Sequence, residues 1–336
     1  MSHALMRSRG YVLGDRPRVV VIGGANVDVK AHSAARVRQG TSNPGHISLT
    51  PGGVGRNVAE NLARLGTRTF LVAAVGRDAA GESLLNQTAA AGVRVEYVHR
   101  TDQPTGTYVA LLDCDGEMVA AVADMAATSA LGPEEVNRAR DLIATAGLVV
   151  LDGNLDPGTL DHTLDLAHAS GVRTIVEPVS VVKAARLAPH VTPARPLYAV
   201  TPNRDELAAL TGLAVRTDRQ VRLGCDTLHQ RAVRHVWVRL GERGSLLSSA
   251  SAGTTVIPAP STTIRDVTGA GDAMLAAFCH AVLRGSEPLD AARFGHAAAA
   301  LTIASAHTVR PDLTAQLIEA ELAKSDQAWS DHRAIP

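Results

Sequence analysis

Short apolar runs of strand length alternate with segments of helical periodicity along most of the chain, and this alternation limits the folds open to it. The first run, residues 18–24 (RVVVIGG), is rich in β-branched residues and ends at a glycine pair, as buried parallel strands do. Further strands are expected at 69–75, 148–151, 174–176, 197–200 and 236–238, and helices at 54–65, 80–91 and from 269 to about 323. The pattern predicts an α/β fold with a mostly parallel central sheet and helices on both faces.

Residues 29–51 and 105–123 interrupt the alternation, because they show no helical periodicity. The second segment contains two alternating runs joined by the turn 113–116 (DCDG), which is typical of a hairpin. We expect the two segments to form a small β-sheet that projects from the main domain as a lid. Exposed edge strands in such a sheet favour pairing with a second copy, so a homodimer through the lid is expected.

A single domain accounts for nearly all of the 336 residues. The α/β domain with its lid is expected over residues 18–325. Residues 1–17 contain three arginines and lack the apolar core of a signal peptide, so we expect a poorly ordered extension there. Residues 326–336 are expected to form a C-terminal tail.

The composition argues against several classes of partner. Basic and acidic residues each number 33, the formal net charge is zero, and aromatic residues make up 3% of the chain. Nucleic-acid binders usually carry a basic excess and stacking aromatics, so nucleic acid is not an expected partner. The sequence contains no run of 18 apolar residues, so no membrane association is expected. The three scattered cysteines form no CxxC pair, which fits a reducing compartment, and we expect a cytoplasmic protein.

Residues 266–272 (DVTGAGD) form the most informative motif, because they lead directly into an apolar helix. Small residues at a helix start let the backbone approach a ligand, and the first helical N–H groups then bind an anion such as phosphate. Asp272 lies beside this anion site and can accept a proton from a hydroxyl that attacks phosphorus. The same residue could instead cap the helix and complement its dipole, and the motif alone does not decide.

A second glycine motif, residues 51–57 (PGGVGRN), also leads into a helix. Its glycines allow the backbone to approach a small ligand, and Asn57 supplies both a donor and an acceptor. Asp28 follows the first strand, at the edge of a parallel sheet where ligands bind, and can accept hydrogen bonds from two adjacent sugar hydroxyls. A plain glycine turn and a turn-capping Asp are the alternatives.

Asn203 and Glu206 follow the strand expected at 197–200. Their oxygen atoms suit Mg²⁺, which keeps several waters and shares phosphate oxygens. A helix N-cap with an acidic first turn predicts the same residue types, so this pair alone does not distinguish a Mg²⁺ site from a helix cap. The sequence lacks the Gly-Lys-Ser/Thr of a P-loop, and GxGxxG does not follow the first strand.

The motifs at 51–57 and 266–272, in this order, resemble the two signatures of the ribokinase-like (phosphofructokinase-B type) family of sugar and nucleoside kinases. The strand–glycine beginning, the β lid and the pair Asn203 and Glu206 agree with this resemblance, which covers about 18–320. It implies a three-layer α/β/α sandwich with a small β-sheet lid. The implied activity is transfer of the ATP γ-phosphate to a primary hydroxyl, with Mg²⁺ as cofactor.

The resemblance also implies roles for individual residues. Asp272 would be the catalytic base, and the N–H groups of an anion hole would hold the phosphate; these belong to Gly269, Ala270 and Gly271. The nucleotide would contact Asn203, Gly241, Gly244, Thr268, Gly269 and Gly271. Asn203 and Glu206 would hold Mg²⁺, partly through water, and Asp266 and Thr268 are candidate ligands of a monovalent cation such as K⁺.

Within the family, the chain most resembles the pseudouridine kinases, through the segments 42–45 (SNPG), 111–113, 116–118, 124–125, 177–180 with Lys183, and 310–313. This resemblance implies phosphorylation of the ribose 5′-hydroxyl of pseudouridine. The implied substrate ligands are Asn26, Asp28, Ser42, Asn43, Gly52, Gly53, Asn57, Thr107, Asp124 and Lys183. Glu177 departs from the pattern, because these kinases tend to have Asp there. The alternatives are another sugar or nucleoside kinase of the family, such as a ribokinase, a fructokinase or an adenosine or uridine kinase, and a non-catalytic ribokinase-like binding protein.

Overall fold

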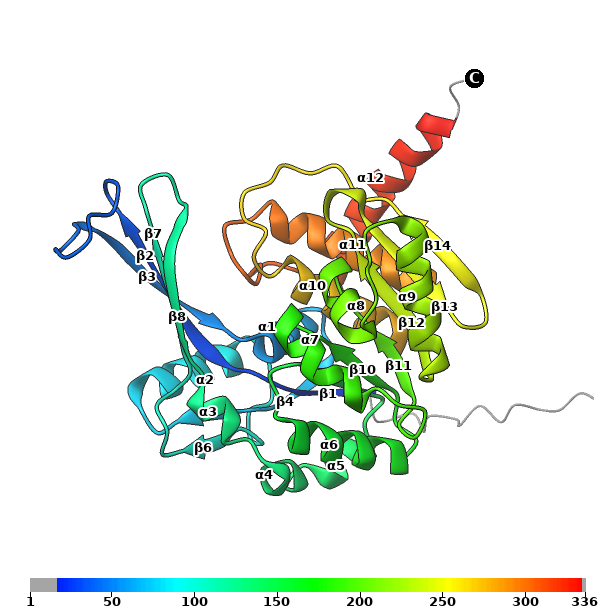
Figure 1. Ribbon diagram of the computed structural model, residues 1–336, viewed down its shortest axis with the longest axis horizontal. Coiled ribbons are helices and arrows are strands. Elements are labelled where there is room, and N and C mark those ends of the chain that lie inside the picture. The colour runs from blue at the N-terminus through cyan, green and yellow to red at the C-terminus, as the bar shows by residue number, and fades with distance from the viewer. Residues whose placement is uncertain (1–16, 334–336) are drawn as a thin grey trace, which may run out of the picture.

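The structure is a computed structural model that describes residues 17–333, so most of the extension predicted at 1–17 lies outside the described residues. An eight-stranded sheet forms its centre (Figure 1). In spatial order the strands are β14 (Gly253–Ile257), β13 (Ser245–Ser249), β12 (Val233–Arg239), β11 (Leu197–Val200), β10 (Thr174–Glu177), β9 (Leu148–Asp152), β1 (Arg18–Ile22) and β4 (Arg68–Val72). All neighbours from β12 to β4 are parallel, whereas β13 and β14 are antiparallel. The predicted α/β class is confirmed.

Helices cover both faces of this sheet, because its strands are apolar on both sides. Val19 and Val21 belong to one hydrophobic core, and Val20 and Ile22 to the other, and all four are fully buried. The first core is covered by α1 (Val54–Arg64), α2 (Ala79–Ala90), α10 (Ala270–Leu283), α11 (Pro288–Ile303) and α12 (Ala315–Arg333). The second is covered by α4 (Pro133–Asn137), α5 (Arg140–Ala144), α6 (Pro157–Ala169), α7 (Val181–Leu187), α8 (Arg204–Thr211) and α9 (Asp218–Gln230).

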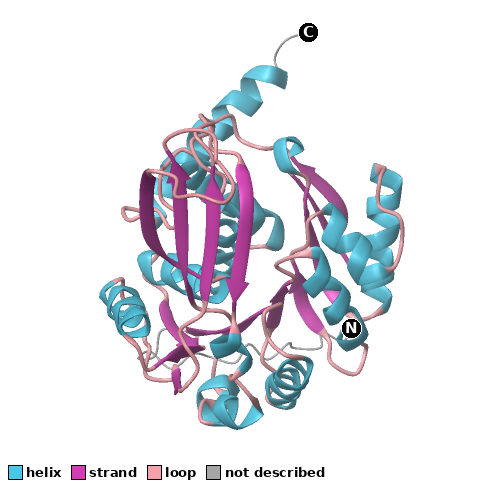
Figure 2. Cartoon of the chain, turned by 60° about the vertical axis from the view of Figure 1, so that its left-hand side comes forward, coloured by secondary structure: helices cyan, strands magenta, loops and turns pink. Residues whose placement is uncertain are grey.

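A second, four-stranded sheet projects to one side of the main domain (Figures 1 and 2). Its strand order is β3 (Gly45–Gly52), β2 (Asn26–Ser33), β7 (Thr107–Leu112) and β8 (Met118–Asp124). The segments that interrupt the alternation in the sequence contribute these strands. The short strands β5 (Ala74–Gly76) and β6 (His99–Thr101) pair separately, and α3 (Ala126–Ser129) follows β8.

The chain departs from the sequence prediction in two places. The helical stretch expected from 269 to about 323 is divided into α10, α11 and α12, and α12 continues to Arg333, within the segment predicted as a tail. The hairpin of β13 and β14 was not predicted, because these strands are rich in Ser and Thr. Ser245 in β13 is buried and bonded to the Trp237 and His296 side chains, which explains how a polar strand can lie inside the fold.

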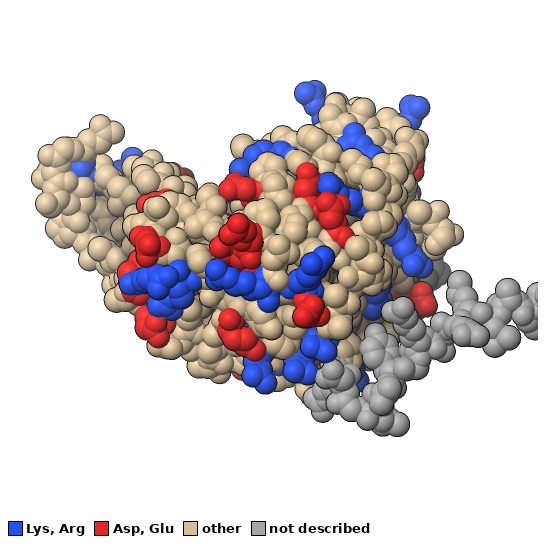
Figure 3. All heavy atoms as spheres, turned by 90° about the horizontal axis from the view of Figure 1, so that it is seen from below, with Lys and Arg blue, Asp and Glu red and all other residues tan. Residues whose placement is uncertain are grey.

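On the face shown in Figure 3, acidic and basic side chains lie interspersed, as a formal net charge of zero suggests. Within residues 17–333, no helix is both long enough and apolar enough to span a bilayer.

Candidate active site

The parallel strands of the main sheet end in polar residues at one edge. β9 ends at Asp152, β10 at Glu177 and β12 at Arg239. Asp152 and Glu177 are paired across neighbouring strands, and Gly23 follows β1 on the other side of β9. Because the carboxyl ends of parallel strands meet at one edge, this edge gathers charged groups that are far apart in the sequence, and it is the candidate active site.

Helix α10 begins beside this edge with an open N-terminus. Gly269 is its N-cap and has a φ of 79°, and a Cβ there would lie 1.9 Å from the carbonyl oxygen of Thr308. Only glycine is therefore accommodated at this position. The N-cap makes no side-chain hydrogen bond to the helix, and the N–H of Ala270 donates a long bond of 3.3 Å to the carbonyl oxygen of Val267. The N–H groups that follow Ala270 in the first turn are available to an anion. Ala270, Gly271 and Asp272 form the first turn, as the motif predicts.

The two glycine motifs meet at Asp272. Asn57 Nδ2, in α1, donates a hydrogen bond of 2.8 Å to Asp272 Oδ2, across 215 residues of sequence. Arg56, whose side chain is 2% exposed, donates to Asn57 Oδ1, which fixes the orientation of the amide. Arg56 is itself held by the carbonyl oxygens of Pro51 and Gly52, at 3.2 and 3.1 Å. The glycine turn thus positions the group that contacts the predicted base.

The surroundings of Asp272 change its acidity. Burial raises the pKa of its carboxyl group to about 7, and the negative charge of Glu177 acts in the same direction. The hydrogen bond from Asn57 and the charges of Arg239 and Arg56 oppose this rise in pKa. A carboxylate whose pKa lies near neutral pH is well matched to accept a proton from an alcohol during a reaction.

The raised pKa of Asp272 leads to a prediction about pH. The base must be ionised, so kcat/KM should rise through an acid limb with an apparent pKa near 7 and level off above it. Replacing Asn57 by Ala removes a hydrogen bond that lowers this pKa, so the limb should move to higher pH. Any titration of the nucleotide is common to both proteins, so the shift between their profiles reports Asp272. Identical acid limbs in the two profiles would contradict the assignment.

Asp28 lies on β2 with its carboxylate against the glycine turn. Asn26 Nδ2 donates to Asp28 Oδ1 at 2.7 Å. A Cβ on Gly52 would lie 2.4 Å from Asp28 Oδ2, and a Cβ on Gly53, which has a φ of 93°, would lie 2.4 Å from the carbonyl oxygen of Gly24. Burial raises the pKa of Asp28. The predicted substrate ligands Asn26, Asp28, Gly52 and Gly53 are therefore packed together, and neither glycine has room for a side chain.

Asp152 was missed by the sequence analysis, although it holds this part of the site together. It is 1% exposed, and its Oδ2 accepts the N–H groups of Gly24 and Gly55 at 2.9 and 2.8 Å. The same oxygen accepts a bond of 3.0 Å from Asn154 Nδ2, and Lys183 Nζ donates to Asn154 Oδ1. Burial lowers the pKa of Lys183, and the charge of Asp152 opposes this effect. Lys183 is therefore connected to the glycine turns through Asn154 and Asp152.

Asn203 and Glu206 form a helix cap, which is the alternative that the sequence left open. Asn203 Oδ1 accepts the N–H of Glu206 at 2.9 Å, and Glu206 Oε2 accepts the N–H of Asn203 at 2.8 Å. Among residues 17–333, no three or more His, Cys, Asp or Glu side chains are arranged to hold a metal ion. Asn203 Oδ1 and Glu206 Oε2 are both engaged in the cap, and the Mg²⁺ role of the pair stays a prediction.

The predicted nucleotide ligands Gly241 and Gly244 follow β12, next to Asn203. The N–H of Arg239 donates to the carbonyl oxygen of Pro202 at 2.8 Å, which joins the ends of β11 and β12. Gly244 has a φ of 83°, and a Cβ there would lie 2.1 Å from the carbonyl oxygen of Ile257. The turn that would carry a nucleotide is thus fixed by close backbone packing.

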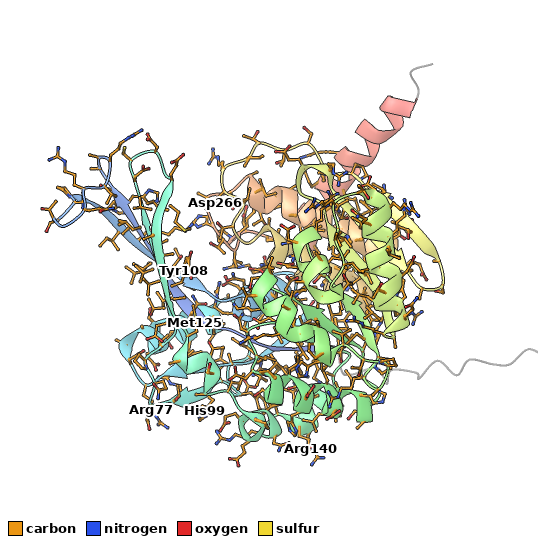
Figure 4. All side chains as sticks on the ribbon, viewed as in Figure 1. Arg77, His99, Tyr108, Met125, Arg140 and Asp266 are labelled. Carbon is orange, nitrogen blue, oxygen red and sulfur yellow. The ribbon has the colours of Figure 1, made fainter. Side chains whose placement is uncertain are left out.

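The carboxylate of Asp266 is already engaged by two groups of this chain. Its Oδ1 accepts the N–H of Thr268 at 2.8 Å, and its Oδ2 accepts Lys30 Nζ at 3.4 Å. Lys30 lies on β2, so this ion pair joins the small sheet to the loop before α10, and Figure 4 shows Asp266 facing that sheet. An ammonium group beside Asp266 does not favour the monovalent-cation site predicted at this side chain.

The remaining predicted substrate ligands lie apart from Asp28. Ser42 and Asn43 belong to the loop at the tip of the small sheet, where the Asn43 amide bonds to backbone groups of Arg38 and Thr41. Thr107 and Asp124 are paired with each other, and Thr107 is paired with Val27. Side chains alternate between the faces of a sheet, so both point to the face opposite Asp28.

Tyr108 occupies the position that Thr107 was expected to fill. It is paired with Asp28 in the parallel register of β2 and β7, so the two side chains share a face. Figure 4 shows Tyr108 on the small sheet, beside the main domain. Sequence reasoning missed Tyr108, Arg56, Asp152 and Arg239. Asp152 and Arg239 directly follow the strands predicted at 148–151 and 236–238, so the rule that placed Asp28 at the sheet edge could have found them.

Comparisons with known proteins agree with this geometry. Residues 16–315 match the pfkB family carbohydrate kinase. The chain is 34% identical over 311 residues to a pseudouridine kinase of Escherichia coli, covering 92% of this chain and 95% of that protein. It is 33% identical to an uncharacterised sugar kinase of the same organism, covering 94% and 86%. The structure of a ribokinase from Arabidopsis thaliana complexed with ribose and ATP superposes with a TM-score of 0.81 at 25% identity, covering 92% of this chain and 99% of that one.

Proposed function

We propose that this chain, which belongs to the pfkB family of carbohydrate kinases, transfers the γ-phosphate of ATP to the 5′-hydroxyl of pseudouridine. Membership of the family makes it a kinase, and the substrate is the part that we propose. The contact between Asn57 and Asp272 carries the proposal for catalysis, because it joins the two family motifs around one carboxylate with a pKa near neutral pH.

The proposed reaction uses groups that the structure brings together. The 5′-oxygen forms a bond to the γ-phosphorus while the bond from that phosphorus to the bridging oxygen of ATP breaks, and ADP leaves. Asp272 accepts the hydroxyl proton, and the N–H groups of Gly269, Ala270 and Gly271 hold the transferring phosphoryl oxygens. Bound Mg²⁺, held through water by Asn203 and Glu206, would neutralise phosphate charge.

Two observations support a nucleoside over a free sugar. The relative named as a pseudouridine kinase is 34% identical over nearly the whole chain. In addition, Tyr108 lies beside Asp28 on one face of the small sheet, which offers an aromatic ring next to the residue proposed to bind the ribose hydroxyls. We propose that Lys183 donates to a carbonyl oxygen of the base. The match to an uncharacterised sugar kinase keeps a sugar substrate as the second candidate.

A comparison of acceptors tests the substrate. We expect the largest kcat/KM for pseudouridine, and smaller values for uridine, ribose, fructose and adenosine at fixed ATP and Mg²⁺. Pseudouridine joins the base to the sugar through carbon and exposes an additional N–H, so an acceptor aimed at that N–H would remain unpaired with uridine. One such hydrogen bond changes binding by about 1 kcal/mol when it is partly hydrated and by more when it is buried.

The same comparison includes Lys183→Ala. This variant should raise KM for the nucleoside and leave KM for ATP almost unchanged. A best rate with ribose, fructose or adenosine would overturn the substrate proposal and leave membership of the family intact. Equal changes in both KM values would remove Lys183 from the proposed substrate site.

We also propose that two copies associate through the small sheet. Its face opposite Asp28 carries Ile47, Leu49, Val109 and Val122, whose side chains are 62, 67, 40 and 69% exposed. These apolar residues share one face by the register of the strands, and exposed apolar surfaces of this kind mark interfaces. A second copy of the same sheet presents a matching surface, which makes self-association the fitting arrangement.

Charge substitution on this face tests the association. Leu49→Lys combined with Val122→Lys should convert a dimer to a monomer in sedimentation-velocity experiments. Leu223→Lys is the matched control, because Leu223 is an exposed leucine of α9, away from the small sheet, and should leave the dimer intact. A wild-type chain that remains monomeric at micromolar concentration would overturn the proposal.

A further inference from the structure

Arg239 joins the end of β12 to two carboxylates and to the start of α10. Its Nη2 donates to Glu177 Oε1 at 2.7 Å and to Glu206 Oε2 at 3.1 Å. Glu177 and Glu206 are both buried, and Glu177 also accepts the hydroxyl of Thr201 at 2.6 Å. The two carboxylates therefore fix one side of the guanidinium group, because each is itself held in place by the fold.

The other side of this guanidinium faces the anion loop. A Cβ on Gly271 would lie 2.6 Å from Arg239 Nη1, so this nitrogen lies directly against the backbone of the first turn of α10. Within residues 17–333, both side-chain hydrogen bonds of Arg239 come from Nη2, and Nη1 donates to no acceptor. The Arg239 side chain is 22% exposed, so a ligand can reach it. A cationic donor without an acceptor thus lies next to the N–H groups that attract an anion.

We propose that Arg239 Nη1 binds an oxygen of the terminal phosphate of the nucleoside triphosphate and stabilises the charge of the phosphoryl group during its transfer. The inference deepens the proposed function and rests on it. A guanidinium group remains charged at every relevant pH and suits phosphate recognition through its planar array of donors. Glu177 and Glu206 orient Arg239 and make it costly to move, so the donor is in place before the reaction begins.

A purely structural role makes a different prediction. If Arg239 served only to neutralise Glu177 and Glu206, its loss would weaken the edge of the sheet as a whole. ADP and ATP analogues would then lose affinity by the same factor. A contact with the terminal phosphate instead affects only ligands that carry that phosphate, so a comparison of the two ligands separates the two roles.

The experiment compares Arg239→Gln with the wild type in the presence of Mg²⁺. Calorimetry should show a loss of affinity for a non-hydrolysable ATP analogue of about 10-fold or more, with ADP affinity unchanged within about 2-fold, because ADP lacks the contacted phosphate. Turnover should fall by about 10²-fold or more, as the loss of a preorganised phosphate donor does. Arg239→Lys should recover only part of this loss, because one ammonium cannot replace the planar array of donors.

Two further variants complete the test. Arg100→Gln is the matched control, since Arg100 lies on β6 and pairs with Glu82 at the surface, and this variant should behave as the wild type. Combining Arg239→Gln with Glu177→Gln removes one of the two buried charges that lose their partner, so it should recover part of the thermal stability without restoring turnover. Equal losses of affinity for ADP and the ATP analogue, or a turnover within about 3-fold of the wild type, would overturn the inference. Failure of the wild-type protein to phosphorylate any acceptor would overturn the proposed function, while the binding comparison would still test Arg239.

Discussion

Replacing Asp272 by Asn is expected to reduce kcat by about 10²- to 10⁴-fold, which is the usual cost of losing a general base. Asparagine has nearly the same shape and can still meet the amide of Asn57, but it cannot accept the hydroxyl proton. The KM for ATP and the thermal unfolding midpoint should therefore change little. Steady-state kinetics and thermal unfolding of the same preparation provide the measurements.

Asp290→Asn is the matched control for this variant. Asp290 is an exposed acid in the first turn of α11, so it complements a helix dipole without facing the candidate site. If Asp272 had only this structural role, the two variants would lose similar small amounts of stability, about 0.3–1 kcal/mol, and both would keep their turnover. A kcat for Asp272→Asn above half the wild-type value would contradict its assignment as the base.

The parts of the site that could be predicted from the sequence are those encoded by contiguous motifs. A glycine-rich segment directly before an apolar helix specifies its own geometry, because it fixes both the close backbone approach and the direction of the first N–H groups. Gly53, Gly269 and Asp272 therefore lie as their motifs suggest. The alternation of strands and helices likewise specified the parallel sheet, since each parallel connection requires a crossing helix.

The residues that were missed have partners far away in the sequence. Asp152 lies 128 positions from Gly24 and 97 from Gly55, and Arg239 lies 62 positions from Glu177. In the sequence, each is a single polar residue at the end of an apolar run. Many strands end in this way, so the local pattern does not indicate a special role. Their roles depend on the strand order, in which β1 lies beside β9 and β11 lies between β10 and β12, and composition carries no information about that order.

Strand register explains the misplaced substrate ligand on β7. Thr107 was expected in the site, but the pairing of β2 with β7 matches it to Val27 and matches Tyr108 to Asp28. A shift of one residue exchanges the two faces of a strand, so the choice between adjacent residues depends entirely on the register. Both faces of the small sheet carry apolar residues, and the sequence pattern of β7 therefore contains no signal that distinguishes them.

Replacing Asp152 by Asn should reduce the free energy of unfolding by about 2–4 kcal/mol, because the change removes a buried charge-assisted network. Oδ1 accepts the N–H of Asn154 at 2.9 Å, and Oδ2 accepts three further N–H groups, so the carboxylate has only donors around it. An asparagine amide in the same place directs its own N–H₂ group at one of these donors. Neither the N–H₂ group nor the donor that it faces then has an acceptor. The lost charge also lies at the N-terminus of α1, where a negative group is favourable.

Chemical denaturation measures this loss, and Asp156→Asn provides the control. Asp156 is the N-cap of α6 and makes no side-chain capping bond, so its replacement should cost well under 1 kcal/mol. Because Asp152 connects the turn at Gly24 to Lys183 through Asn154, its replacement should also raise the KM for the acceptor more than the KM for ATP. An unfolding free energy within about 1 kcal/mol of the wild type would show that the glycine turns are held by their own backbone packing, since a Cβ at Gly53 would lie 2.4 Å from the carbonyl oxygen of Gly24 even without the carboxylate bonds.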